Sequence, residues 1–240
     1  MSKINIVLHH TSHPGNIGAT ARAMKNMGFT SLRLVNPKSY PSPEATSRAS
    51  GAEDVLKTLT VYSNIKSAIS DCELVVGASA RNRGISLPTI TPEEFALMTL
   101  LHSSEKVACV FGNEQAGLSN EEISLCQYQL VIPTSDKYSS LNLGMAVQII
   151  CYEVFVLSLN GSHRKPKINN ENYQVATQKE IDNLNDYIEE LAYASKFIHP
   201  IHPKKIKLRI RRIINRMTLS ANEVNLIWGF LRSVEIKNNE

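Results

Sequence analysis

The chain has 240 residues, of which 42% are hydrophobic and 20% are charged, a globular composition. Its longest apolar run, Met145 to Leu159, contains Gln148 and Glu153 and is too short to span a bilayer. The formal net charge of +4 divides into −1 for residues 1–160 (12 Lys and Arg, 13 Asp and Glu) and +5 for residues 161–240 (14 and 9). The basic excess of the tail indicates an anionic partner, and nucleic acid is the partner that we expect.

The chain begins directly with a strand pattern and has no signal-peptide features. Its four cysteines, Cys72, Cys109, Cys126 and Cys151, lack the spacing of a metal or redox site. We therefore expect a cytoplasmic protein whose cysteines are reduced and structural.

Strand and helix patterns alternate through the first 160 residues. Apolar runs bounded by polar turns predict strands at residues 4–8, 31–35, 60–62, 73–77, 106–111 and 129–132. Helix patterns lie between them, and an apolar helix pattern follows from Leu143 to Leu159. This alternation predicts an α/β fold with a parallel sheet that helices cover on both faces.

Polar or glycine-bearing turns follow several of these strands, where open α/β sheets place their ligands. Gly112, at one such turn, is expected to let a ligand approach the backbone closely. Before the long apolar helix, Ser139 or Ser140 is a natural N-cap, which leaves the first N–H groups of the helix open around Leu141 and Asn142. Together with Tyr138, these residues predict a binding mouth at the entrance of that helix.

Several other residues leave alternatives open. Arg22 lies in a small-residue helix with Gly18 and Asn26 on its face. It is either an ordinary surface arginine or a residue on a face that a ligand or a second backbone approaches closely. Arg81 and Arg83 are either solvated or clamps for phosphate groups.

Two kinds of site are not supported by the sequence. Neither the glycine pattern of dinucleotide-binding folds nor a phosphate loop with Gly-Lys-Ser/Thr occurs. His9, His10 and His13 cluster near the end of the first strand, but no acid or cysteine stands at ligand spacing, so we predict no metal site.

The tail reads as a linker and a helical extension. Residues 161–177 are polar and form the linker, and residues 178–240 contain three amphipathic patterns. In the second pattern Ile206, Ile210, Ile213 and Met217 predict one apolar face. Between residues 204 and 216 seven cations occur without an acid, which we expect to point outward toward RNA, the alternative being a merely solvated helix. These cations are Lys204, Lys205, Lys207, Arg209, Arg211, Arg212 and Arg216.

Three segments of the body carry a family resemblance. They are Asn16–Gly28, Phe111–Leu118 and the stretch from Ile132 through Tyr138-Ser-Ser-Leu-Asn-Leu-Gly-Met-Ala to Val147. In this order and spacing they resemble the motifs of the SPOUT (trefoil-knot) RNA ribose methyltransferases. The resemblance extends to residues 79–83, and the tail is similar to the C-terminal extension of tRNA-modifying members.

The resemblance implies a SPOUT fold with a C-terminal trefoil knot over residues 1–160, S-adenosylmethionine as methyl donor, and a homodimer whose active site is completed across the interface. It also implies 2′-O-methylation of the first nucleotide of the tRNA anticodon loop, at cytidine or uridine. Neither a membrane nor DNA is expected as a partner. The alternatives are a ribosomal RNA ribose methyltransferase and a knotted RNA-binding protein without catalysis.

Site residues follow from the resemblance position by position. Arg22 matches the motif arginine at the reacting ribose, and Glu114, Tyr138, Ser140 and Asn142 fall on supporting positions. Arg81 and Arg83 fall on RNA-contacting positions. The residues implied to hold the cofactor are Ala78, Ser79, Ala80, Gly112, Ile132, Ser139, Ser140 and Leu141. Because a guanidinium stays protonated far above neutral pH, we expect Arg22 to clamp a phosphate or the developing alkoxide rather than to act as the base.

Overall fold

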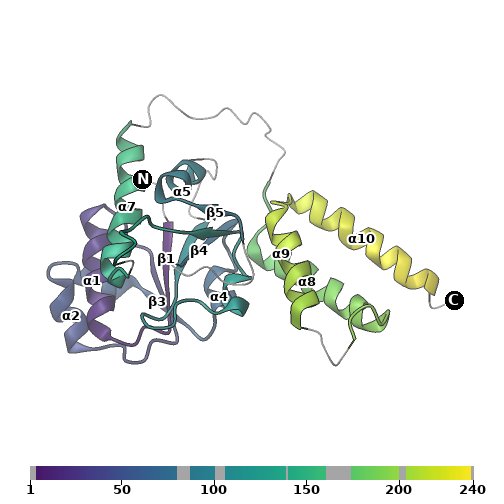
Figure 1. Ribbon diagram of the computed structural model, residues 1–240, viewed down its shortest axis with the longest axis horizontal. Helices are drawn as coiled ribbons and strands as arrows, with labels where there is room; N and C mark the ends of the chain where they lie inside the picture. Colours follow the sequence, from purple (N-terminus) through teal and green to yellow (C-terminus); the bar gives the residue numbers. More distant parts are fainter. Residues whose placement is uncertain are drawn as a thin grey trace. The chain divides into compact units, whose positions relative to one another are not determined.

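The computed structural model describes residues 4–79, 87–100, 106–138, 140–160, 174–199 and 204–238. The chain divides into two compact units, Met1–Ile168 and Asn169–Glu240. Each unit is described by itself (Figure 1). Most of the predicted linker, residues 161–173, lies outside the described residues, as do Ala80, Arg81, Arg83 and Ser139.

The first unit is built on one sheet, which in the described part of the chain has the strand order β3-β2-β1-β6-β4-β7-β5. Its strands are β1 (Ile4–His9), β2 (Leu32–Val35), β3 (Thr60–Tyr62), β4 (Leu74–Ala78), β5 (Thr89–Ile90), β6 (Val107–Phe111) and β7 (Tyr128–Leu130). All of the pairings between these strands are parallel, which confirms the predicted sheet. The short edge strand β5 is the one that the sequence did not reveal.

Helices cover both faces of the sheet, because side chains of the central strands alternate between two apolar clusters. On one face Ile6 and Leu8 pack with α1 (Pro14–Asn26), α2 (Pro43–Ala49), α3 (Glu53–Thr58), α5 (Pro92–Thr99) and α7 (Leu143–Asn160). On the other face Val7 and Val110 pack with α4 (Ile65–Ile69) and α6 (Asn120–Ile123). Burial on both faces explains why β1 and β6 read as continuous apolar runs.

The small residues of α1 serve helix packing. A Cβ on Gly18 would lie 2.1 Å from the carbonyl oxygen of Ala45 in α2, so a side chain there would collide with backbone. On another side of α1, a Cβ on Gly144 of α7 would lie 3.0 Å from Ala19 Cβ. Gly18 therefore admits the backbone of a second helix to α1, which is one of the two alternatives that the sequence left open for this face, the other being a ligand.

The second unit consists of α8 (Gln178–Ala194), α9 (Lys204–Arg216) and α10 (Ala221–Asn238) around a small core that includes Ile181, Leu184 and Val224. Residues 174–176 belong to this unit rather than to a linker, because Ala176 N–H donates to the Leu219 carbonyl at 2.9 Å and Val175 bridges Ser220. None of the helices in the described residues is both long enough and apolar enough to cross a membrane.

The predicted apolar face of α9 is partly wrong. Ile213 and Met217 are 49% and 51% exposed, and Ile214 packs against the core instead. The inner face of α9 is polar, with Arg211 and Asn215 both buried. The buried side of α9 therefore contains a charged residue, Arg211, and the acids that pair with it lie on α8.

Candidate active site

A cavity of about 640 Å³ opens at the carboxyl ends of β4, β6 and β7 and at the start of α7. We call it the motif cavity. Its lining residues include nine that were predicted as site residues: Ala78, Ser79, Gly112, Glu114, Ile132, Tyr138, Ser140, Leu141 and Asn142. Its walls also contain the apolar side chains of Phe111, Leu130 and Leu143. The structure thus brings most of the expected site together, whereas Ala80 and Ser139 lie outside the described residues.

A chain of hydrogen bonds joins the three sequence motifs at this cavity. Glu114 Oε1 accepts from Asn16 Nδ2 at 2.8 Å, and Asn16 Oδ1 accepts from Asn142 Nδ2 at 3.1 Å. Asn142 Oδ1 in turn accepts from Gly144 N–H at 2.9 Å. Each amide is therefore oriented by its neighbours, and one end of the chain is a carboxylate.

Both carboxylate oxygens of Glu114 accept hydrogen bonds. Its Oε2 accepts from the N–H of Ser12 at 2.9 Å and from Ser12 Oγ at 2.7 Å, in addition to the bond from Asn16. Burial would raise the pKa of Glu114, but the hydrogen bonds from Asn16 and Ser12 outweigh it and lower the pKa below its ordinary value. Glu114 is thus an ionised clamp on the loop that leads into α1.

Asn142 caps the long apolar helix α7. Its side chain accepts from Gly144 N–H, and its carbonyl accepts the helical bond from Ala146 N–H at 2.9 Å. The expectation that Ser139 or Ser140 is the N-cap is therefore wrong: Ser140 precedes the cap and is exposed at the cavity. Asparagine competes well with serine at this position, and here the partner Asn16 adds a further bond.

The structure requires glycine at position 112 for a different reason from the expected one. A Cβ at this residue would lie 2.3 Å from the carbonyl carbon of Gly117 and 2.4 Å from Leu118 N. The loop 112–118 folds back on itself, with Gly117 N–H donating to the Asn113 carbonyl at 2.7 Å. Gly112 is thus required by its own loop, and a Gly112→Val change would distort that loop rather than test ligand contact alone.

Arg22 lies in a separate hollow of about 700 Å³, between α1 and the start of α7. Arg48, Met145 and Gln148 also line this hollow. Leu141 and Asn142 line both hollows and stand between them. Arg22 is exposed and makes no hydrogen bond or ion pair with any residue that the structure describes. Within one chain, Arg22 and Glu114 therefore face different hollows.

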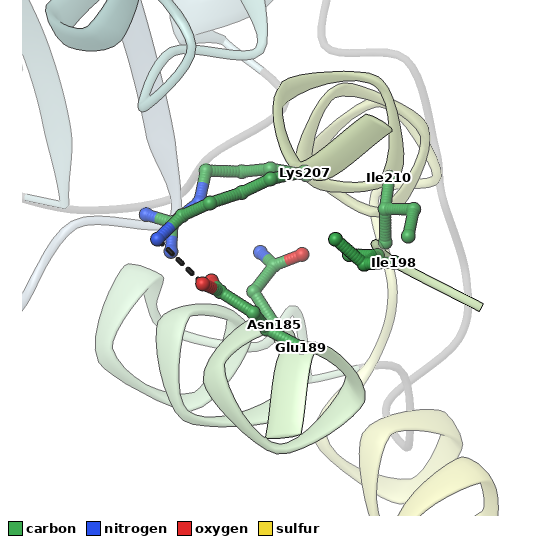
Figure 2. Close-up of a pocket in the computed structure, with 6 residues that line it drawn as sticks. Asn185, Glu189, Ile198, Lys207 and Ile210 are labelled. Carbon is green, nitrogen blue, oxygen red and sulfur yellow. Dashed lines mark ion pairs between the residues drawn. The ribbon is translucent and has the colours of Figure 1, made fainter. Parts of the chain in front are cut away.

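Two of the tail cations are paired with acids of α8, and one of these two does not point outward as expected. Arg211 is buried on α9, with Nη2 2.9 Å from Asp186 and Nη1 3.5 Å from Asp182, both on α8. Lys207 Nζ lies 2.6 Å from Glu189 Oε1. Figure 2 marks this ion pair with a dashed line. Arg209 and Arg216 are exposed and Arg212 is half-buried. The side chains of Lys204 and Lys205 lie outside the described residues.

Sequence reasoning missed two participants, Asn16 and Ser12. Asn16 stands inside the first motif segment, and its position ahead of a small-residue helix was the available signal. Ser12 carried no signal of its own, because its role depends on Glu114, which lies 102 positions later in the chain.

Comparison with known proteins agrees with this geometry. A model described as the SpoU rRNA Methylase family matches residues 3–152, and a model described as the tRNA methyltransferase TrmJ C-terminal domain matches residues 179–240. A protein of Klebsiella pneumoniae subsp. pneumoniae named tRNA (cytidine/uridine-2′-O-)-methyltransferase TrmJ is 38% identical over 99% of this chain and 98% of its own length.

Two further relatives extend the comparison. A Pseudomonas aeruginosa protein named tRNA (cytidine/uridine/adenosine-2′-O-)-methyltransferase TrmJ is 39% identical over 98% of this chain and 95% of its own. The crystal structure of TrmJ from Z. mobilis is 30% identical, covers 98% of this chain and 100% of that one, and superposes with a TM-score of 0.86. The predicted SPOUT resemblance is confirmed: the chain belongs to the SpoU methylase family, in its TrmJ branch.

Proposed function

We propose that this protein transfers a methyl group from S-adenosylmethionine to the ribose 2′-hydroxyl of a cytidine or uridine in tRNA, at the first nucleotide of the anticodon loop. The observation that carries the proposal is the hydrogen-bonded chain Glu114–Asn16–Asn142 at the edge of the motif cavity. It unites the three motif segments in one site, as an assembled active site requires.

The motif cavity suits S-adenosylmethionine. Its volume of about 640 Å³ lies in the range of small-molecule sites, which are mostly apolar with a few fixed polar groups. Leu130, Ile132 and Leu141 would hold the adenine, and Ser79 and Ser140 offer hydroxyl groups. When bound, the cofactor supplies an electrophilic methyl group on a sulfonium centre.

The protein's part of the chemistry is positioning. A ribose hydroxyl attacks only when it is aimed at the methyl group and loses its proton, so orientation supplies much of the rate. The ionised Glu114 holds Asn16 and Ser12, and through Asn16 it fixes the amide of Asn142. We assign Glu114 a positioning role and leave Tyr138 and Ser140, both exposed at the mouth, to contact substrate or cofactor.

The separate hollow of Arg22 supports the homodimer. We propose that Arg22 of one protomer meets the reacting ribose held at the motif cavity of the other, where its planar fork binds phosphate or the developing alkoxide. The face beside it carries Met145 and Tyr152, which are 62% and 51% exposed. Covering these side chains with a second copy would remove apolar surface from water.

The tRNA substrate is supported by the relatives' names and by the tail. Both named relatives act on tRNA, and they differ in whether adenosine is included. We propose that Arg209, Arg212 and Arg216, with Lys204 and Lys205, contact the tRNA backbone and that Arg211 and Lys207 stabilise the helical unit. A tRNA substrate and reduced cysteines agree with the expected cytoplasmic location.

Calorimetry with S-adenosylmethionine distinguishes an enzyme from a knotted RNA-binding protein without catalysis. We expect saturable binding by the wild type and loss of binding in Ala146→Phe, which places a ring in the motif cavity. Ala194→Phe, on an exposed position of α8, is the matched control. Absence of binding by the folded wild type would contradict the proposal. Offering tRNA and ribosomal RNA in parallel methylation assays separates the two substrate alternatives.

A further inference from the structure

A third hollow, of about 540 Å³, shares the loop 112–118 with the motif cavity. Asn113 and Gly117 line both. We call it the histidine hollow; its other lining residues are His9, His10, Ser12, Asn36, Lys38, Ala116, Ser119 and Glu122. The function proposed above does not use the side chains of His10, Asn36 and Lys38, which we call the rim of this hollow.

The rim is held in a fixed shape. His10 and Asn36 follow β1 and β2 with φ values of 52° and 45°, a left-handed backbone that is uncommon outside glycine. Hydrogen bonds secure both residues: His10 N–H donates to the Val35 carbonyl at 2.9 Å, and Asn36 Nδ2 donates to the Ser63 carbonyl at 2.8 Å. Asn113 Nδ2 also donates to the His10 carbonyl at 2.8 Å. Such conformations persist where the surroundings determine them, and they cluster at functional sites.

The inner wall contains a histidine beside a carboxylate. His9 is buried, and its Nδ1 lies 3.2 Å from Glu122 Oε1. The other oxygen of Glu122 accepts from Ser119 N–H at 2.6 Å, so the carboxylate in this wall is engaged on both sides. Burial lowers the pKa of His9, against the opposite effect of Glu122. Among the described residues, no three His, Cys, Asp or Glu side chains gather closely enough to hold a metal ion.

The rim offers a ring and a cation. The side chains of His10 and Lys38 are exposed, and the His10 ring packs edge-on against His9 with centroids 4.1 Å apart. An aromatic ring on which a base can stack, together with an ammonium for phosphate, is the combination that binds single-stranded nucleic acid. The hollow is large enough for one nucleotide.

We propose that the histidine hollow holds a nucleotide of the substrate RNA that is adjacent to the methylated one, with its base on the His10 ring and its phosphate at Lys38. The inference rests on the proposed function, because one loop connects the two sites. Ser12 lines the histidine hollow, while its N–H and Oγ hold Glu114 beside the motif cavity. A nucleotide seated there would fix the chain direction of the RNA across the reaction site.

The test compares Lys38→Ala and His10→Asn in the full chain, with Lys57→Ala on an exposed position of α3 as the control. Asparagine tolerates the left-handed backbone at position 10, so this change removes the ring and spares the fold. The substrate is an anticodon stem–loop RNA, and its Kd is measured by fluorescence anisotropy beside KM, kcat and cofactor affinity. We expect Kd and KM to rise roughly fivefold or more in each variant, with kcat and cofactor affinity within about twofold.

An abasic substitution in the RNA identifies the contact. Removing the base on one side of the target should weaken binding to the wild type and leave His10→Asn without further loss, because both changes delete the same contact. Equal RNA affinity for His10→Asn, Lys38→Ala and Lys57→Ala would overturn the proposal. Because anisotropy does not need turnover, a wild type that binds this RNA but methylates nothing would refute the proposed function separately.

Discussion

At the scale of single residues, the site depends on one carboxylate whose partners are all donors. An ionised carboxylate accepts without donating, so Glu114 can satisfy Ser12 N–H, Ser12 Oγ and Asn16 Nδ2 together. In a glutamine of the same shape, an NH2 group would replace one oxygen and would face a donor of Ser12 or Asn16. The shape of the loop before α1 therefore depends on the charge of Glu114 as well as on its size.

We expect Glu114→Gln to lower turnover about a hundredfold, because loss of positioning near a reaction centre costs about that factor. Cofactor affinity should change only a few-fold. The measurement is a single-turnover methylation rate, with Glu93→Gln, an exposed carboxylate at the start of α5, as control. Wild-type turnover in Glu114→Gln would show that the hydrogen-bonded chain has no part in catalysis.

The same carboxylate has a signature in pH dependence. Its pKa in the folded protein lies below the ordinary value, so its contribution to stability is present above the ordinary pKa and is lost as pH falls through the lowered value. Glu114→Gln should therefore lower the melting temperature at pH 7 and lower it less at pH 4. An equal loss at both values would contradict the assigned ionisation of Glu114.

At the scale of elements, the sequence predicted what depends on local pattern. Strands such as β1 and β6 were found because burial on both faces makes them uninterrupted apolar runs. The edge strand β5 was missed because two residues carry no periodicity. The cap of α7 was assigned to a serine because local propensity does not include Asn16, whose contact with Asn142 spans 126 positions.

Helix α9 shows where the pattern misled. Its cations were expected outside because the opposite face was predicted to be apolar, yet Arg211 pairs with Asp186, 25 positions earlier in α8. The spacing of apolar residues in one helix does not reveal such pairing between helices, and Ile213 and Met217, predicted on the apolar face, are exposed. The lining of the motif cavity was predictable because its residues stand in compact motifs, whereas the buried position of Arg211 depends on tertiary contact.

We expect Arg211→Met to destabilise the helical unit by about 3 kcal/mol or more, because it leaves Asp182 buried without this partner. Arg209→Met, on the exposed side of α9, should change stability by about 0.5 kcal/mol or less. Trp228, the single tryptophan, stacks on Tyr187 at 5.1 Å in this unit, so its fluorescence during urea unfolding reports on the unit by itself. Equal midpoints for the two variants would show that the ion pair is not structural.

At the scale of the whole molecule, the net charge differs between the body, residues 1–160 at −1, and the tail, residues 161–240 at +5. Two of the seven cations between residues 204 and 216, Arg211 and Lys207, are paired with acids of α8 that the net charge of +5 already counts. The contact with tRNA that we propose for the tail therefore involves fewer cations than the sequence count implies. The trefoil knot of the family stays an expectation from the resemblance.

We expect the double change Arg209→Ala and Arg216→Ala to weaken tRNA binding and to flatten its dependence on salt. If both arginines reach phosphates, the slope of log affinity against log salt should fall by roughly 0.7–0.9 for each contact. The control is Lys179→Ala, an exposed cation of the same unit on α8. Slopes that match the control's would assign the exposed arginines of α9 to solvation alone.

The central claim is most directly tested by finding the methyl group. The purified wild type is incubated with S-adenosylmethionine and unmodified tRNA, and the product is digested and mapped by mass spectrometry. We expect one 2′-O-methylated cytidine or uridine, at the first nucleotide of the anticodon loop, formed about a hundredfold more slowly by Arg22→Ala. Absence of a methyl group on tRNA, its appearance on ribosomal RNA instead, or undiminished turnover by Arg22→Ala would contradict this account.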